Sequence, residues 1–200
     1  LSEEMLGLCE EASHLGSDYS GLGDALINEA NMVVSEIYSP PRVTDAARVF
    51  RKLGITPGFA LDITVDDESG EPWDFTKVEK QEKAIALTID TEPDLVVRSP
   101  ACTDFSPWQR LNKAVSQHPE KYDEAKKAAV KHLEFICKIY KIQHSDGRLL
   151  LHEHPRQASS WEEEVIEDVM NLPGVDYIDM GQCQYGQVDS EGNPIKKPTR

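Results

Sequence analysis

The sequence predicts an α/β fold in which helices flank a doubly wound, mostly parallel β-sheet. Three observations predict it. Short apolar runs alternate with helical patterns at least four times along the chain, as in successive strand–helix–strand units. The run at residues 94–98, DLVVR, is too continuously apolar for a strand with a solvated face. The 200 residues, of which 39% are hydrophobic and 28% charged, suffice for one globular domain with a core.

Local signals divide the chain and place its strands. Residues 1–32 are predicted to be an N-terminal helical segment that packs on the core, and residues 33–200 to be the α/β domain. Apolar runs bounded by turn-forming residues predict the strands of this domain. These strands are expected at residues 33–38, 59–64, 94–98, 148–152 and 175–180.

Helices are predicted in the segments between these strands. The first, TDAARVFRKLG, has Thr44 as its N-cap and Gly54 as its C-cap, and the second covers residues 77–92. A long amphipathic helix is expected to end at Asp146–Gly147, and the last helix to begin at the N-cap Ser160.

The composition argues against several classes of protein. The net charge of −15 opposes broad electrostatic attraction to nucleic acid, and KKPTR at the C-terminal end is a short basic cluster. No apolar run approaches the ~18 residues that cross a membrane, and the acidic start lacks the layout of a signal peptide. The four cysteines are scattered without a C-x-x-C pair, which favours neither a disulfide framework nor a metal site. We therefore expect an intracellular protein of the cytoplasm or nucleus, with reduced thiols and no membrane partner.

Polar residues follow the predicted strands at the edge where α/β folds bind ligands. Ser39 follows the first strand, Asp62 lies in the second, Cys102 follows the third and Glu153 the fourth. Because the carboxyl ends of parallel strands meet at one edge of a sheet, we expect these four side chains to share a cleft. Polar residues at strand ends are also common without a site, so each has a structural interpretation beside the functional one.

Cys102 lies in RSPACTDFSPW, where Pro100 and Pro107 disfavour a continuous helix and predict an accessible loop. A nucleophilic thiolate needs exposure and a nearby cation or helix N-terminus, and Arg98 or a helix that starts after the loop would supply one. Cys102 is therefore either a nucleophile, more reactive than Cys137 on its apolar helix, or a small buried cysteine at a strand end.

Glu153 stands between His152 and His154, directly after an apolar run. Burial there would suit its carboxyl to donate or share a proton, and the alternative is a solvated carboxylate at a strand end. A metal site is less favoured, because adjacent strand residues point to opposite faces. Asp62 is either a carboxylate that holds a ribose hydroxyl or a loop cap, and Asp74 either a neighbour of an adenine ring or a turn anchor.

In their order along the chain, these residues resemble the catalytic core of the DNA 5-methylcytosine methyltransferases. EIYSP stands where that family has D/E-L-F-A/S-G, SPACTDFS where it has P-P-C-x-x-F-S, and HEHP where it has E-N-V. His154 and Pro155 replace the Asn and Val of the last motif, and Pro40 and Pro41 replace glycines of the family's cofactor loop. Over residues 33–186, the matching residues are Glu36, Tyr38, Ser39, Asp62, Asp74, Pro100, Cys102, Phe105, Ser106, Glu153 and Gln182.

The chain also resembles methyltransferase-like domains in polyproteins of mobile elements and in environmental viral sequences. Such domains share its SPPRVT, HEHP and SSW segments. That second resemblance implies the same fold and no defined activity.

The first resemblance implies methyl transfer from S-adenosylmethionine to carbon 5 of cytosine in a nucleic acid, on a Rossmann-like sheet of the methyltransferase type. Cys102 would attack carbon 6 of the base, and Glu153 would hydrogen-bond the ring nitrogen N3 and the amino group. The target base would have to leave its stack. Because the chain is acidic, a partner chain or a missing recognition domain would supply the binding of nucleic acid. The cofactor would lie against Glu36, Tyr38, Ser39, Asp62, Asp74 and Pro100.

Two alternatives stay open beside such an enzyme. The chain is also interpreted as a catalytically inactive methyltransferase-like module of a larger polyprotein, which binds a partner or a nucleotide. A cysteine hydrolase, with His152 or His154 as the base of Cys102, accounts for the histidines but not for the order of the motifs.

Overall fold

The computed structural model describes residues 31–200, and the predicted helical segment 1–32 lies almost entirely outside them. Four strands form one sheet in the order β2-β1-β3-β4, and every neighbouring pair is parallel. This confirms the predicted α/β fold, a Rossmann-like doubly wound sheet whose strand order reverses between β1 and β3. The strands are β1 (Met32–Ile37), β2 (Ile55–Leu61), β3 (Leu95–Arg98) and β4 (Leu149–His152).

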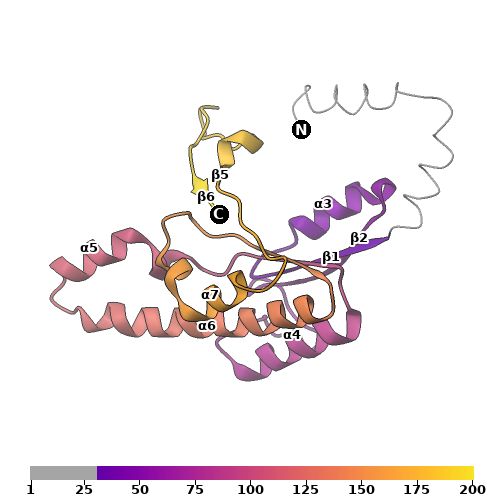
Figure 1. Ribbon diagram of the computed structural model, residues 1–200, viewed down its shortest axis with the longest axis horizontal. Coiled ribbons are helices and arrows are strands. Elements are labelled where there is room, and N and C mark those ends of the chain that lie inside the picture. Colours follow the sequence, from indigo (N-terminus) through magenta and orange to yellow (C-terminus); the bar gives the residue numbers. More distant parts are fainter. Residues whose placement is uncertain (1–30) are drawn as a thin grey trace.

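Helices cover the two faces of the sheet unequally, as Figure 1 shows. On one face α3 (Val43–Val49) packs on β1 and β2. On the other face lies the long α6 (Glu120–Ser145), with α4 (Val78–Thr91) and α7 (Glu164–Met170) beside it. The remaining elements are short: η1 (Arg51–Leu53), η2 (Thr103–Phe105), α5 (Pro107–Val115), η3 (Ser159–Glu162), β5 (Met180–Gly181), η4 (Gln182–Tyr185) and β6 (Pro198–Thr199).

β1 is a central strand, and its last four residues, Val34–Ile37, are all buried. Two of them, Ser35 and Glu36, are polar, so the strand departs from the alternation of apolar and polar residues that a half-exposed strand shows. Burial of both faces explains the departure, because helices of the structure lie over β1 on either side. Polar atoms in such a strand need hydrogen-bond partners, and Glu36 has several.

The carboxyl ends of the strands line up in register. Ile37 of β1 pairs with Leu61 of β2 and with Arg98 of β3, and Arg98 in turn pairs with His152 of β4. Paired residues of parallel strands point to the same face of the sheet. This face is the one that α6 covers, since Arg98 Nη1 donates to the carbonyl oxygen of Ile136 at 3.1 Å.

α6 supplies much of the core. Leu133, Ile136, Ile139 and Tyr140 recur at helical spacing and are almost fully buried against the sheet and the neighbouring helices. Each buried aliphatic side chain of this size stabilises the fold by about 1.5–3 kcal/mol. Within residues 31–200, no helix, α6 included, combines the length and the apolar character needed to cross a membrane.

Both ends of β2 differ from the prediction. The strand spans Ile55–Leu61 instead of residues 59–64, so Asp62 falls just beyond its carboxyl end. The strand passes through Pro57, which lacks an N–H, and the edge position of β2 tolerates it. Gly54 ends η1 with a positive φ of 72°, as expected of a C-cap glycine, and turns the chain directly into β2.

The predicted strand at residues 175–180 is wrong. Only its last residue joins a strand, β5, which pairs antiparallel with β6 outside the main sheet. Side chains of this segment make other contacts in place of a ladder: Asp176 accepts from the N–H of Tyr177 at 2.9 Å, and Asp179 binds Arg200. The outer edge of β4 therefore has no strand partner among residues 31–200.

Two predicted helix starts are also wrong. Thr44 lies inside α3, whose N-cap is Arg42, and its hydroxyl donates to the carboxylate of Glu36. Ser160 lies in η3, before α7 begins, and its hydroxyl contacts His154. In both cases the hydroxyl binds another side chain and not a backbone N–H of its own helix, so the capping signal in the sequence was misleading.

Candidate active site

The loop that carries Cys102 is hydrogen-bonded directly to the residues that follow β4. Ser99 Oγ donates to Glu153 Oε2 at 3.2 Å, and the N–H of Glu153 donates to the carbonyl oxygen of Arg98 at 3.1 Å. His154 Nε2 lies 2.9 Å from the carbonyl oxygen of Pro100. The two candidate catalytic residues thus lie on neighbouring segments that fix each other at the carboxyl edge of the sheet.

Cys102 is half-buried and lies just before the single turn of η2. The fully buried side chain of Phe105 anchors this turn in the core. The next helix, α5, begins only at Pro107, with Ser106 as its N-cap accepting from the N–H of Trp108 at 3.3 Å. No helix therefore runs through RSPACTDFSPW, which confirms the predicted loop, and Cys102 is partly exposed in it.

Cys137 differs from Cys102 in every respect that matters for reactivity. It lies within α6 and is 3% exposed, and burial raises the pKa of its thiol to about 12. A thiol with this pKa has a thiolate fraction of about 10⁻⁴ at pH 8, and the thiolate is the reactive form.

Native alkylation will distinguish the two cysteines. We expect iodoacetamide at pH 8 to label Cys102 well before Cys137, because only Cys102 combines access with a loop position. Peptide mass spectrometry over a time course measures the order of labelling, with Cys183, also half-buried, as the internal comparison. Protection of Cys102 until the chain is unfolded in urea would assign it a purely structural role.

Three side chains donate hydrogen bonds to the carboxylate of Glu153. Besides the bond from Ser99, its Oε1 accepts from the hydroxyl of Thr199 and, at 3.4 Å, from the side-chain amide of Gln182. The C-terminal residues reach it because Arg200 and His154 exchange two backbone hydrogen bonds of 3.0 and 3.1 Å. Gln182 belongs to the resemblance, whereas no local signal in the sequence pointed to Thr199.

His154 is fixed by hydrogen bonds at both ring nitrogens. It is 1% exposed, burial lowers its pKa, and both of its nitrogens are engaged. A carbonyl oxygen only accepts, so Nε2 carries the proton toward Pro100 and Nδ1 accepts from Ser160 Oγ at 2.7 Å. Neither nitrogen is free to take a proton from Cys102, which weighs against a cysteine hydrolase with this base. The other candidate base, His152, uses Nδ1 for the hydroxyl of Tyr140 at 2.7 Å.

Glu36, expected near a cofactor, supports the protein backbone. It is fully buried, and its carboxylate accepts from the N–H groups of Arg42, Val43 and Thr44 at 2.8–3.2 Å and from the hydroxyl of Thr44. Burial by itself raises the pKa of Glu36, but the bonds from Thr44 and Val43 outweigh it and hold the pKa below its usual value. These bonds fix the loop after β1 and the start of α3.

Tyr38 turns inward at the end of β1. Its φ of 61° is left-handed, and its hydroxyl lies 2.6 Å from His132 Nδ1 on α6. Its ring centroid is 4.9 Å from that of Phe75, and burial raises the pKa of the phenol. The next residue, Ser39, donates to the carbonyl oxygen of Pro40 at 2.9 Å. Glu36, Tyr38 and Ser39, the three residues expected at this end of the cofactor site, thus all bond to the protein itself.

Asp62 and Asp74 form matching turns after β2. Each accepts, through Oδ1, the N–H (3.0 Å) and the hydroxyl (2.7 Å) of the threonine two residues on, Thr64 or Thr76. The bond from the Thr76 hydroxyl is the largest influence that lowers the pKa of Asp74. Both side chains are partly exposed, and Oδ2 of each has no partner among residues 31–200. Each carboxylate therefore keeps one oxygen for a ligand.

Ser39, Asp62, Cys102 and Glu153 all follow strands at the same edge of the sheet, and direct contact is seen between the Cys102 loop and Glu153. Within the part of the chain that the structure describes, no cluster of three or more His, Cys, Asp or Glu residues could hold a metal ion. Comparisons of the chain with protein-family models, curated proteins and solved structures give no match.

Proposed function

We propose that this chain is a methyltransferase-fold enzyme that methylates carbon 5 of cytosine in a nucleic acid through a cysteine adduct. The contact between the Cys102 loop and the Glu153–His154 segment carries the proposal. A nucleophile and a proton-sharing carboxyl that act on one base must lie close together. In this chain the segments that carry Cys102 and Glu153 are hydrogen-bonded to each other.

The chemistry begins at the two candidate catalytic groups. The Cys102 thiolate adds to carbon 6 of cytosine, which forms an S–C bond and moves the C5–C6 electron pair toward carbon 5. Glu153 shares its proton with N3 and accepts from the amino group, which stabilises the charge that develops on the ring. The bound cofactor would supply the methyl group to carbon 5 and leave as S-adenosylhomocysteine. The carbon 5 proton would then pass to water, and elimination would break the S–C bond and return the thiolate.

S-adenosylmethionine, when bound, would supply an electrophilic methyl group. The residues of the chain fit one half of this cofactor. The open oxygens of Asp62 and Asp74 suit the hydroxyls of a ribose beyond β2. Glu36 has no such oxygen, because backbone and hydroxyl donors engage both of its oxygens, and Pro40 offers no N–H. We therefore assign the nucleoside to Asp62 and Asp74.

Nucleic acid would be bound with help from outside the described residues. The net charge of −15 gives the chain no general attraction to phosphate, so a partner chain or a further domain would supply that affinity. The target base would be unstacked to reach Cys102, and single-stranded substrates lower that cost.

A catalytically inactive methyltransferase-like binding module is the second candidate. The loop after β1 favours it, because Pro40 and Pro41 lack N–H groups and the carboxylate of Glu36 is taken up by the chain itself. Such a module would keep the fold and bind a nucleotide or a partner without transferring a methyl group.

Cofactor binding and methyl transfer together test the proposal. We expect calorimetric titration to show one site for S-adenosylmethionine, and tritium from its labelled methyl group to appear in cytosine of single-stranded DNA or RNA. Asp62→Asn should weaken cofactor binding about tenfold, since a charged acceptor is lost. Asp66→Asn, an exposed neighbour, is the matched control and should have no effect. Binding without transfer would favour the inactive module, and the absence of both would overturn the enzyme.

A further inference from the structure

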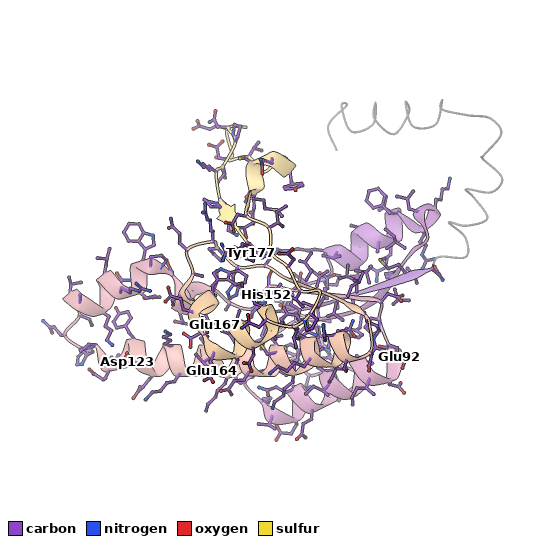
Figure 2. All side chains as sticks on the ribbon, in the orientation of Figure 1. Glu92, Asp123, His152, Glu164, Glu167 and Tyr177 are labelled. Carbon is purple, nitrogen blue, oxygen red and sulfur yellow. The ribbon has the colours of Figure 1, made fainter. Side chains whose placement is uncertain are left out.

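A pocket lies along the free edge of β4, and Glu153, whose carboxylate contacts the Cys102 loop, is among the residues that line it. Its volume is about 520 Å³, within the range of pockets that hold small organic ligands. One wall is β4 itself, and the opposite wall is the extended segment at residues 174–178. Figure 2 labels His152 and Tyr177, one from each of these walls.

The lining is mostly apolar and aromatic. Trp161 and Tyr177 offer flat surfaces, and Tyr140 reaches the pocket from α6. Such a lining favours a ligand with a flat apolar body, because aromatic and aliphatic walls gain from burying it. The aliphatic part of the wall consists of Leu150, Ile166, Val169, Met170, Val175 and Ile178.

His152 presents a hydrogen-bond donor without an acceptor. Its Nδ1 lies 2.7 Å from the hydroxyl of Tyr140, and its Nε2 is buried without a partner among residues 31–200. If Tyr140 donates to Nδ1, a single orphan remains, the Nε2–H. In the reverse arrangement the Nδ1–H would donate to the Tyr140 oxygen. Both the hydroxyl proton and the Nε2 lone pair would then lack a partner, which costs more free energy. The Nε2–H is therefore a donor without an acceptor, on a residue that lines the pocket.

An uncompensated positive charge lies behind this donor. Arg98 is fully buried, its guanidinium stacks on the Tyr140 ring at 4.8 Å, and its Nε and Nη2 have no partner within the described chain. No carboxylate pairs with it in that part of the chain, whereas Arg148 and Arg200 at the pocket have acidic partners. A buried cation of this kind favours an anionic ligand group nearby.

From the pocket shape, the orphan donor and the buried guanidinium, we infer that this site binds a flat, apolar carboxylic acid. The ring system lies between β4 and residues 174–178, and a carboxylate oxygen accepts from His152 Nε2. Two carboxylates, Glu153 and Asp176, also line the pocket. Both already accept hydrogen bonds from the protein, Glu153 from Ser99 and Asp176 from the N–H of Tyr177.

Calorimetry with 2-naphthoate, a flat apolar acid, tests the site directly. We expect one saturable site with a dissociation constant of about 0.1 mM, which is typical of a ligand of this size. The isosteric 2-naphthamide keeps the shape and an acceptor but has no charge. It should bind about tenfold more weakly, because hydrogen bonds to charged acceptors are the stronger ones.

Two variants connect binding to the named residues. The double change Tyr140→Phe and His152→Phe removes the donor and its partner together, which leaves no stranded hydroxyl, and should weaken naphthoate binding about tenfold. Val175→Trp fills the pocket from its outer wall and should abolish binding. Val188→Trp, at an exposed residue away from the lining, is the matched control and should bind like the parent chain.

Circular dichroism of each variant establishes that it is folded before titration. Absence of saturable naphthoate binding to the unaltered chain would overturn the inference, and so would unchanged binding in both test variants. Glu153 lines this pocket and also belongs to the proposed methyl transfer, but the naphthoate test uses neither Cys102 nor the methyl donor. The two proposals therefore fail separately.

Discussion

Replacement of Cys102 by serine will abolish covalent capture of 5-fluorocytosine and reduce methyl transfer by about a thousandfold or more, because a hydroxyl is a far weaker nucleophile than a thiolate. Fluorine on carbon 5 cannot leave as a proton does, so an adduct that has gained its methyl group stays attached to the sulfur. Incubation of the chain with a 5-fluorocytosine oligonucleotide and S-adenosylmethionine should therefore give a band that resists denaturing electrophoresis.

Cys183→Ser is the matched control for this experiment. Cys183 is also half-buried and lies in η4, next to Gln182, which contacts Glu153. The control should form the adduct as the parent chain does, and tryptic mapping should place the oligonucleotide on Cys102. Capture that survives in the Cys102→Ser variant, or that maps to Cys183, would contradict the proposed nucleophile.

Replacement of Glu36 by alanine should lower the free energy of unfolding by about 3 kcal/mol, the largest stability effect that we expect of a single carboxylate here. The change leaves three backbone N–H groups at the start of α3, and the hydroxyl of Thr44, without an acceptor. Urea denaturation followed by circular dichroism measures the effect. Glu79→Ala, an exposed residue in the first turn of α4, is the control and should shift stability by less than about 0.5 kcal/mol.

Glu36 also makes the free energy of unfolding depend on pH. The hydrogen bonds hold the pKa of Glu36 below its value in the unfolded chain. The unfolded state therefore binds more protons on acidification, so the contribution of Glu36 is complete above about pH 4.5 and is lost as the pH falls through the lower folded value. The stability difference between the parent chain and Glu36→Ala should shrink over that acidic range. A difference that stays constant from pH 7 to pH 3 would contradict this account.

Much of the main sheet could be predicted from the sequence, because apolar runs that alternate with helical patterns identify parallel strands. The segment at residues 175–180 shows the limit of that reasoning. Its pattern resembles a strand, but pairing depends on contacts that Asp176 and Asp179 make elsewhere. The capping signal of Ser160 failed for the same reason, since its hydroxyl binds His154.

The site could be predicted only in part. Cys102 and Glu153 follow neighbouring parallel strands, so topology alone brings their segments together. The position of a residue at a strand end does not fix the direction of its side chain, and Glu36 and Tyr38 both turn into the protein. Thr199 binds Glu153 from a distant part of the chain, through a pairing that only the folded structure reveals.

The connectivity of the sheet has a consequence for how the chain folds. Every pair of hydrogen-bonded strands in the main sheet is parallel, so no hairpin joins strand neighbours and each pairing must close a long loop first. α6 is 26 residues long and needs only local contacts, so helix formation on the microsecond timescale should precede sheet assembly, which takes milliseconds to seconds. During that interval the three consecutive leucines of β4, at an edge without proline or charge, are open to pairing with other chains. Refolding yield should therefore depend strongly on protein concentration.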